Sequence, residues 1–123
     1  MAAMILVVDD SPSVRSLETL ILKTGGFQTD QAANGVEALE KIYKGHYDLI
    51  ISDVNMPKMD GLAFIKTLRE QEAYKNIPVI MMTSEAEEKD RMIGVAAGAN
   101  VYLVKPATPD KLLLNVKMLL GKI

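Results

Sequence analysis

The chain has 123 residues, of which 49% are hydrophobic and 24% are charged, so it can form one core of ordinary globular composition. We expect one domain over residues 1–123. The formal net charge of -2 argues against a protein that binds the phosphate backbone of nucleic acids, because such proteins usually have a basic surface. With no cysteine and one histidine, the chain lacks a disulfide framework, a thiol nucleophile and the usual zinc ligands, so a metal site must use oxygen ligands.

Short apolar runs alternate with stretches of helical period along the whole chain. This alternation is typical of repeated strand–helix units around a parallel sheet that helices cover on both faces. We expect five units, with strands at residues 4–8, 27–31, 48–52, 77–82 and 101–104. The first run is too short to cross a membrane and leads straight into two aspartates, so we expect a cytoplasmic protein.

Capping signals mark where the intervening helices begin and end. Ser11 and Thr108 each precede a proline, and Asn34 and Ser84 each precede a glutamate by three residues. The expected helices run from residue 12 to the glycines at 25–26, from 35 to about 44, from 60–61 to about 72, from the Ser84–Glu87 capping box to Gly98, and from 109 to the chain end.

Polar residues stand at the carboxyl ends of four expected strands. Asp9 and Asp10 follow the first strand, Asp53 the third, Thr83 the fourth and Lys105 the fifth. In an open parallel sheet these ends meet in one cleft, which is where ligands bind. Three converging carboxylates require a cation, and Mg²⁺ suits an oxygen site that keeps positions open for a phosphate.

The same residues suggest a phosphoryl-transfer chemistry. Asp53, a single carboxylate on a central strand, is the best candidate nucleophile. Lys105 can pair with a carboxylate in the empty site and with phosphoryl oxygens in the filled one, and the Thr83 hydroxyl can donate to a phosphoryl oxygen. Catalysis would then consist of positioning and charge neutralisation.

Five motifs together resemble response-regulator receiver domains over almost the whole chain. They are residues 7–10 (Val-Val-Asp-Asp), 48–53 (Asp-Leu-Ile-Ile-Ser-Asp), 56–61 (Met-Pro-Lys-Met-Asp-Gly), 83–84 (Thr-Ser) and 105–106 (Lys-Pro). The resemblance implies an α/β, doubly wound, flavodoxin-like fold with a five-stranded parallel sheet in the order 2-1-3-4-5. It also implies a phosphoprotein of a two-component system that is no enzyme beyond its own phosphorylation and dephosphorylation.

By this resemblance Asp53 is the phosphorylation site. Asp9, Asp10, Asp53 and the backbone carbonyl of Asn55 would bind Mg²⁺, and Thr83, Tyr102 and Lys105 would be the catalytic and switch residues. The implied partners are a sensor histidine kinase, an output protein such as a flagellar switch component, and a phosphatase.

Asn55, two residues after Asp53, and Glu85, two residues after Thr83, resemble the residues at these positions in chemotaxis regulators. This resemblance favours a role in motor control. Ala107 departs from the pattern, because a large aromatic residue often follows the Lys-Pro pair. A phosphorelay intermediate, or a receiver excised from a larger regulator, stays open as the alternative.

A docking surface is expected beside the last strand. Leu114 and Met118 fall on the side of the last helix opposite its apolar face, and Arg91 and Val95 lie on the outer face of the preceding helix. With Tyr102 on the strand between them, these residues form the predicted docking surface. An incidental exposed apolar pair is the competing interpretation.

Other functions are less compatible with the residues. A flavodoxin-like carrier needs a phosphate-cradling loop after the first strand, where Asp9 and Asp10 would repel the phosphate. A phosphatase would need a cap region over its substrate. Asp9 and Asp10 taken alone could merely cap a helix, and His46 is expected to be exposed and without a role.

Overall fold

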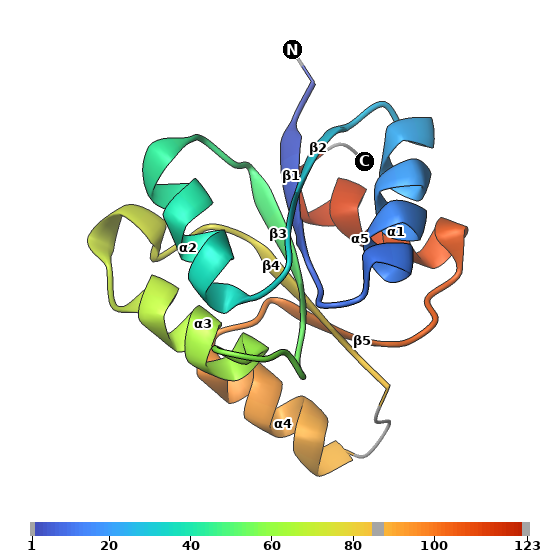
Figure 1. Cartoon of the computed structure of the whole chain (residues 1–123). Coiled ribbons are helices and arrows are strands. Elements are labelled where there is room, and N and C mark those ends of the chain that lie inside the picture. The colour runs from blue at the N-terminus through green and yellow to red at the C-terminus, as the bar shows by residue number, and fades with distance from the viewer. Residues whose placement is uncertain (1, 85–87, 122–123) are drawn as a thin grey trace.

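The computed structural model describes residues 2–84 and 88–121, the second range without the side chains of residues 88–91. Its centre is a sheet of five parallel strands in the order β2-β1-β3-β4-β5, as the resemblance implies (Figure 1). The strands are β1 (Met4–Val8), β2 (Gln28–Ala32), β3 (Leu49–Asp53), β4 (Val79–Thr83) and β5 (Val101–Val104).

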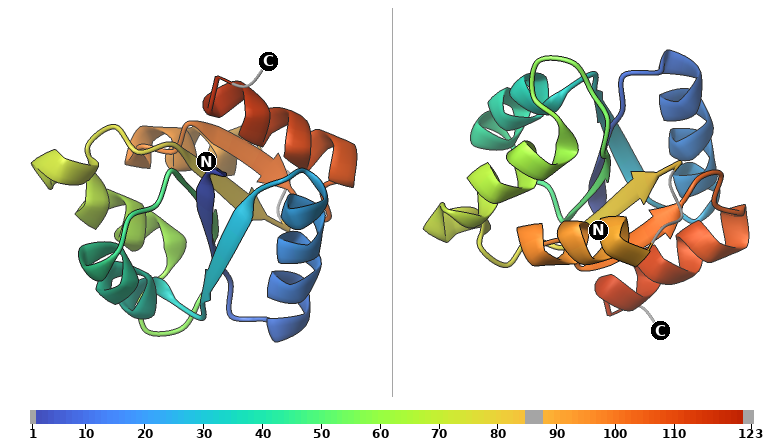
Figure 2. Two further views of the ribbon diagram at one scale, coloured as in Figure 1. Left: turned by 90° about the horizontal axis from the view of Figure 1, so that it is seen from above. Right: turned by 90° about the horizontal axis from the view of Figure 1, so that it is seen from below.

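Helices cover both faces of this sheet. Those described are α1 (Pro12–Thr24), α2 (Gly35–Lys44), α3 (Gly61–Arg69), α4 (Glu88–Ala97) and α5 (Pro109–Leu119), with a short 3₁₀ helix, η1 (Glu72–Tyr74). Figure 2 shows α1 and α5 on one side of the sheet and α2 and α3 on the other. In the part of the chain that the structure describes, no helix is both long and apolar enough to span a bilayer.

The core has two halves, one under each helical layer. Ile5, Ile51 and Ile80 point toward α1 and α5, while Leu6, Ile50 and Met81 point toward α2 and α3. Since β3 and β4 are buried at every position, both faces of the central strands are apolar. This explains why the sequence shows continuous apolar runs there instead of alternation.

Four helix starts have the side-chain caps that the sequence supplies. Ser11, Asn34, Asp60 and Thr108 accept hydrogen bonds from the backbone N–H groups three residues on, at 3.4, 2.9, 2.8 and 3.2 Å. Glu87 of the second predicted capping box, Ser84–Glu87, lies outside the described residues. Each cap fixes the start of the helix that follows a strand, at the carboxyl end of the sheet where the polar residues lie.

Several predicted boundaries were wrong by one to three residues. β2 begins at Gln28, because the Phe27 N–H is bonded to the Leu22 carbonyl and its ring packs in the core. β3 begins and ends one residue later than predicted, and β4 begins two residues later and ends one residue later, so Asp53 and Thr83 are the last residues of their strands.

Two helices end earlier than predicted. Helix α3 stops at Arg69, because Gln71 is extended and η1 follows. Helix α5 stops at Leu119, since Gly121 has a φ of 69° that turns the backbone out of the helix.

Candidate functional site

Three carboxylates lie together at the carboxyl ends of β1 and β3. These neighbouring strands bring Asp9, Asp10 and Asp53 so close that one oxygen of each lies within 4.8 Å of the others. Asp9 and Asp53 are buried, with 1% and 8% of their surface exposed, whereas Asp10 is exposed. Burying like charges at this spacing is costly unless a cation joins them.

Lys105 provides one positive charge in this cluster. Its Nζ lies 2.7 Å from Asp9 Oδ2 and 3.3 Å from Asp53 Oδ1. Burial by itself would lower the pKa of Lys105, but its hydrogen bonds and ion pairs with Asp9 and Asp53 outweigh burial and raise it. Lys105 is therefore an ammonium at neutral pH that links β5 to the two central strands.

The backbone holds Asp9 and its loop in place. Asp9 Oδ1 accepts a hydrogen bond from the Ser11 N–H at 2.9 Å, and Nη1 of Arg15 donates to the Asp9 carbonyl at 2.6 Å. With Lys105 on the other oxygen, both carboxylate oxygens of Asp9 have partners. The position of this carboxylate is thus set by α1 and by Lys105.

Asp53 is held from the loop that follows β3. Its Oδ1 accepts from the Val54 N–H at 2.9 Å, and Gly61 returns to the same place through an N–H bond to the Val54 carbonyl at 2.8 Å. Burial raises the pKa of Asp53, and the Asp9 charge adds to this, while Lys105 opposes both. A Cβ on Gly61 would stand 2.2 Å from the Asp53 carbonyl oxygen, so this approach requires glycine.

The residues present fit a hard divalent cation. Three carboxylates face one ammonium, which leaves excess negative charge, and all of the donors are oxygens. Asp9, Asp10 and Asp53 are the residues that could hold Mg²⁺. Asn55, whose carbonyl was the fourth predicted ligand, is exposed in the loop two residues after Asp53.

Thr83 and Tyr102, two predicted switch residues, lie on the neighbouring strands β4 and β5. Thr83 is the last residue of β4, and Tyr102 lies within β5. Thr83 is buried, and its carbonyl accepts the Lys105 N–H at 2.6 Å, which ties the ends of β4 and β5 together. Tyr102 is half-buried beside α4, where a Cβ on Gly94 would stand 2.6 Å from its ring. The Tyr102 ring can therefore pack directly against α4, because Gly94 has no side chain.

The predicted docking surface is exposed where the structure describes it. Val95, Leu114 and Met118 are 51%, 51% and 60% exposed. They come from α4 and α5, on either side of β5, the edge strand of the sheet. Glu85 and the side chain of Arg91 lie outside the described residues.

Sequence reasoning missed Glu18, a buried acid on α1. It lies on the inward face of the helix with Thr19, Ile21 and Leu22 and is only 6% exposed. Burial and the charges of Asp9 and Asp53 raise its pKa to about 7, with Lys105 opposing. The signal was available, since residue 18 lies one turn from the apolar Val14 and Ile21, on the face that packs on the sheet.

We expect Glu18→Gln to change the pH dependence of stability in metal-free buffer. The folded protein binds the Glu18 proton more tightly than the unfolded chain, so this group contributes stability at low pH that is lost as pH rises from 4.5 toward about 7. Relative to wild type, the variant should gain roughly 2 kcal/mol in unfolding free energy by about pH 8 and little at about pH 4. Urea unfolding across this pH range with a chelator measures the difference, and a constant offset would contradict the assignment.

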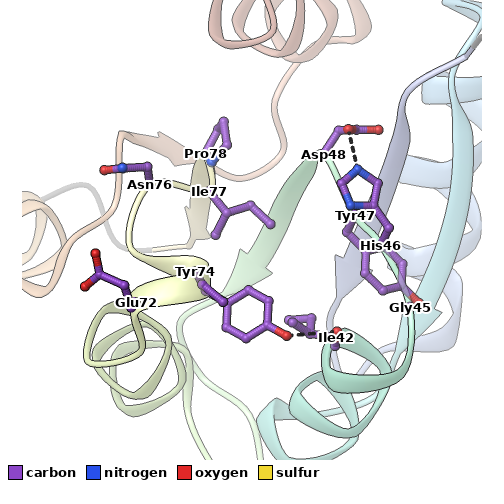
Figure 3. A pocket seen from close by; sticks show the side chains of 11 residues that line it. Ile42, Gly45, His46, Tyr47, Asp48, Glu72, Tyr74, Asn76, Ile77 and Pro78 are labelled. Atoms are coloured by element: carbon purple, nitrogen blue, oxygen red, sulfur yellow. Dashed lines mark hydrogen bonds and ion pairs between the residues drawn. The ribbon is translucent and has the colours of Figure 1, made fainter.

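A separate hollow of about 380 Å³ lies at the other end of the strands, next to the amino-terminal ends of β3 and β4 (Figure 3). His46 Nε2 is 3.1 Å from Asp48 Oδ1 on one side, and the Tyr74 hydroxyl donates to the Ile42 carbonyl across the opening. As predicted, the His46 side chain is exposed. This hollow is far along the strands from the aspartates and takes no part in their site.

The chain matches the response regulator receiver domain over residues 5–117. It is 41% identical over 118 residues to the transcriptional regulatory protein ResD of Bacillus subtilis (strain 168), which covers 96% of this chain and 48% of ResD. The chain spans about half the length of the curated relatives it matches.

Two solved structures are similar over nearly the whole chain. The chemotaxis protein CheY4 of Vibrio cholerae has a TM-score of 0.91 and 42% identity, and covers 97% of this chain and 99% of its own. The signal receiver domain of a signal transduction histidine kinase from Syntrophus aciditrophicus has a TM-score of 0.91 and 38% identity, over 99% of this chain and 92% of its own. TM-scores of 0.91 over nearly the whole chain show that both structures share the fold described above.

Proposed function

Because the chain belongs to the response regulator receiver domain family of two-component systems, we propose that it is a phospho-acceptor switch in which Asp53 takes up a phosphoryl group. One observation carries this proposal. The Asp53 carboxylate lies at the carboxyl end of a central strand, with Asp9, Asp10 and the Lys105 ammonium around it. Such a site neutralises charge around one carboxylate, which is what an acyl phosphate requires.

The proposed step joins an Asp53 oxygen to the phosphorus of a donor while the bond to the leaving group breaks and that group keeps the electron pair. Asp53 Oδ1 is held by the Val54 N–H and Lys105, and Oδ2 has no hydrogen bond with a described residue, so Oδ2 is the attacking atom. A bound Mg²⁺ supplies charge neutralisation for the phosphoryl oxygens. Lys105 adds a second positive charge and moves with the new anion.

The structural response begins at Lys105 and Thr83. The phosphoryl group adds about two negative charges and new acceptor oxygens at one point. The Lys105 ammonium turns to these oxygens, and the Thr83 hydroxyl donates to one of them. Since the Lys105 N–H is bonded to the Thr83 carbonyl, the ends of β4 and β5 move together.

Tyr102 is the proposed reporter of this movement. Its ring rests on Gly94 and packs against the core half under α2 and α3. When Thr83 moves toward the phosphoryl group, the ring can take a second packing position closer to the sheet. Two discrete packings of one side chain are the kind of element that a switch requires.

The exposed apolar residues beside β5 form the proposed output surface. Val95, Leu114 and Met118 flank the strand that carries Tyr102, so a change at Tyr102 alters the surface that a partner meets. A sensor histidine kinase is the proposed phosphodonor, and a phosphatase would shorten the signal.

We expect Met118→Glu to abolish partner docking while phosphorylation stays normal. The Met118 side chain is 60% exposed, so a charge there is tolerated in the free protein but is desolvated in an apolar interface. Capture of the phosphorylated protein by its output partner measures docking, and intact mass measures phosphorylation. Lys23→Glu, on an exposed residue of α1, is the control, and unchanged docking by Met118→Glu would refute this surface.

Two outputs are compatible with this mechanism. Similarity to CheY4, a chemotaxis protein, supports motor control. The similarity to transcriptional regulatory proteins about twice as long supports a receiver that controls an attached output domain. The second output, an alternative at the outset, has the support of the curated relatives.

The experiment that tests the phospho-acceptor function is intact-mass analysis after incubation with acetyl phosphate and Mg²⁺. We expect the mass of one phosphoryl group to be added, and the addition to fail with excess chelator. A time course then separates a short-lived phosphorylated state from a long-lived relay carrier. No addition with Mg²⁺ present would leave a constitutive docking domain as the function.

A further inference from the structure

A cavity of about 340 Å³ lies between α1, the end of β4 and the segment that joins β5 to α5. Its wall is mostly apolar and includes Val14 and Ile21 of α1, Met82 of β4 and Leu112 of α5. Its volume falls within the range of about 300 to 1,000 Å³ that small-molecule sites occupy in proteins. It borders the aspartate cluster through Lys105, which also lines it.

Glu18 supplies the acidic group of this wall. The residue is 6% exposed, and no hydrogen bond or ion pair joins its carboxyl to another residue that the structure describes. Lys105 does not serve it, because the Lys105 ammonium is bonded to Asp9 and lies 3.3 Å from Asp53. Glu18 is therefore a buried acceptor that faces an apolar cavity and has no donor among the described residues.

Such a group destabilises the fold unless something binds it. An unpartnered buried carboxylate costs several kcal/mol, and the pKa of Glu18, raised to about 7 by burial and by Asp9 and Asp53, reflects that cost. The surrounding carboxylates also determine which charge is accepted. The charges of Asp9 and Asp53, which Lys105 offsets only in part, favour a cation at Glu18 and disfavour an anion.

We propose that this cavity binds a small molecule that has an apolar body and a cationic nitrogen, with the nitrogen donating to the Glu18 carboxylate. The apolar body would lie against Val14, Ile21, Met82 and Leu112. The site needs neither a phosphoryl group nor a divalent cation, so it is independent of the function proposed above. It adds to the receiver a place where a soluble organic cation acts next to the acceptor aspartate.

The test is an NMR titration of the isotopically labelled full chain with phenethylamine, in chelator and at about pH 8, where Glu18 is ionised. We expect shifts at Val14, Ile21 and Leu112. Phenethyl alcohol, which keeps the ring but lacks the charge, should bind roughly tenfold more weakly, as should the amine to Glu18→Gln. Glu40→Gln, at an exposed acid of α2, is the matched control and should bind the amine like wild type.

Three results would overturn the proposal. Equal affinity for the amine and the alcohol would show an apolar hollow without a role for the carboxylate. Equal affinity of wild type and Glu18→Gln for the amine would do the same. Shifts confined to Asp9, Asp10 and Asp53 would show that the cation binds the aspartate cluster and not the cavity.

Discussion

Replacing Lys105 with methionine should destabilise the metal-free protein and make its stability depend on Mg²⁺. The variant leaves Asp9, which is 1% exposed, beside Asp53 without the ammonium that lies 2.7 and 3.3 Å from their oxygens. Breaking a buried ion pair in this way costs about 3 kcal/mol. The unfolding free energy should fall by that amount in chelator and recover as Mg²⁺ is added, since the ion neutralises the same carboxylates.

The same variant should bind Mg²⁺ more tightly than wild type, because Lys105 competes with the ion for Asp9 and Asp53. It should nevertheless be phosphorylated more slowly, since it lacks the cation that moves with the phosphoryl group. Lys41→Met is the matched control. Its ion pair with Asp30 is half-exposed, so its removal should cost less than about 1 kcal/mol and leave Mg²⁺ binding unchanged. Equal Mg²⁺ affinity in Lys105→Met and wild type would contradict the proposed competition.

Gly61→Ala should disrupt the proposed acceptor site and the fold around it. The added Cβ would stand 2.2 Å from the Asp53 carbonyl oxygen, which is backbone and cannot swing away. Relief requires separation of the start of α3 from the end of β3, including the Gly61 N–H bond to Val54. We expect a loss of more than about 3 kcal/mol in unfolding free energy and at least tenfold slower phosphorylation.

Gly45→Ala provides the matched control for that change. The nearest atom to a Cβ at Gly45 is the Lys41 carbonyl oxygen at 3.4 Å, an ordinary contact, and the backbone there has a negative φ. This variant should keep wild-type stability to within about 0.5 kcal/mol and wild-type phosphorylation. If Gly61→Ala behaves like Gly45→Ala in urea unfolding, the close approach is absent in solution.

The sheet and its helices could be predicted because their signals are local. Continuous apolar runs marked the strands that are buried on both faces, and Ser11, Asn34 and Thr108 marked helix starts by the chemistry of their side chains. The boundaries that failed depend on long-range packing. Phe27 reads as a strand residue until its ring is seen in the core beside α1.

The site, like the fold, could be predicted where its residues have local signals. Asp9, Asp10, Asp53 and Lys105 follow from their places at strand ends, since a parallel sheet brings these ends together. The chemistry of Glu18 could not be predicted, because its burial without a partner among the described residues depends on how α1 packs against the β5–α5 segment. The role of Gly61 could not be predicted either, because it depends on a close backbone contact for which the sequence has no signal.

The most direct test of the central proposal identifies the residue that carries the phosphoryl group. The protein is incubated with acetyl phosphate and Mg²⁺, treated with borohydride, which reduces an acyl phosphate to an alcohol, and digested for peptide mass analysis. The proposed mechanism predicts the reduced side chain at position 53 and unmodified carboxyls at Asp9 and Asp10. Reduction at Asp9 or Asp10, or addition of phosphate that persists in Asp53→Asn, would contradict it.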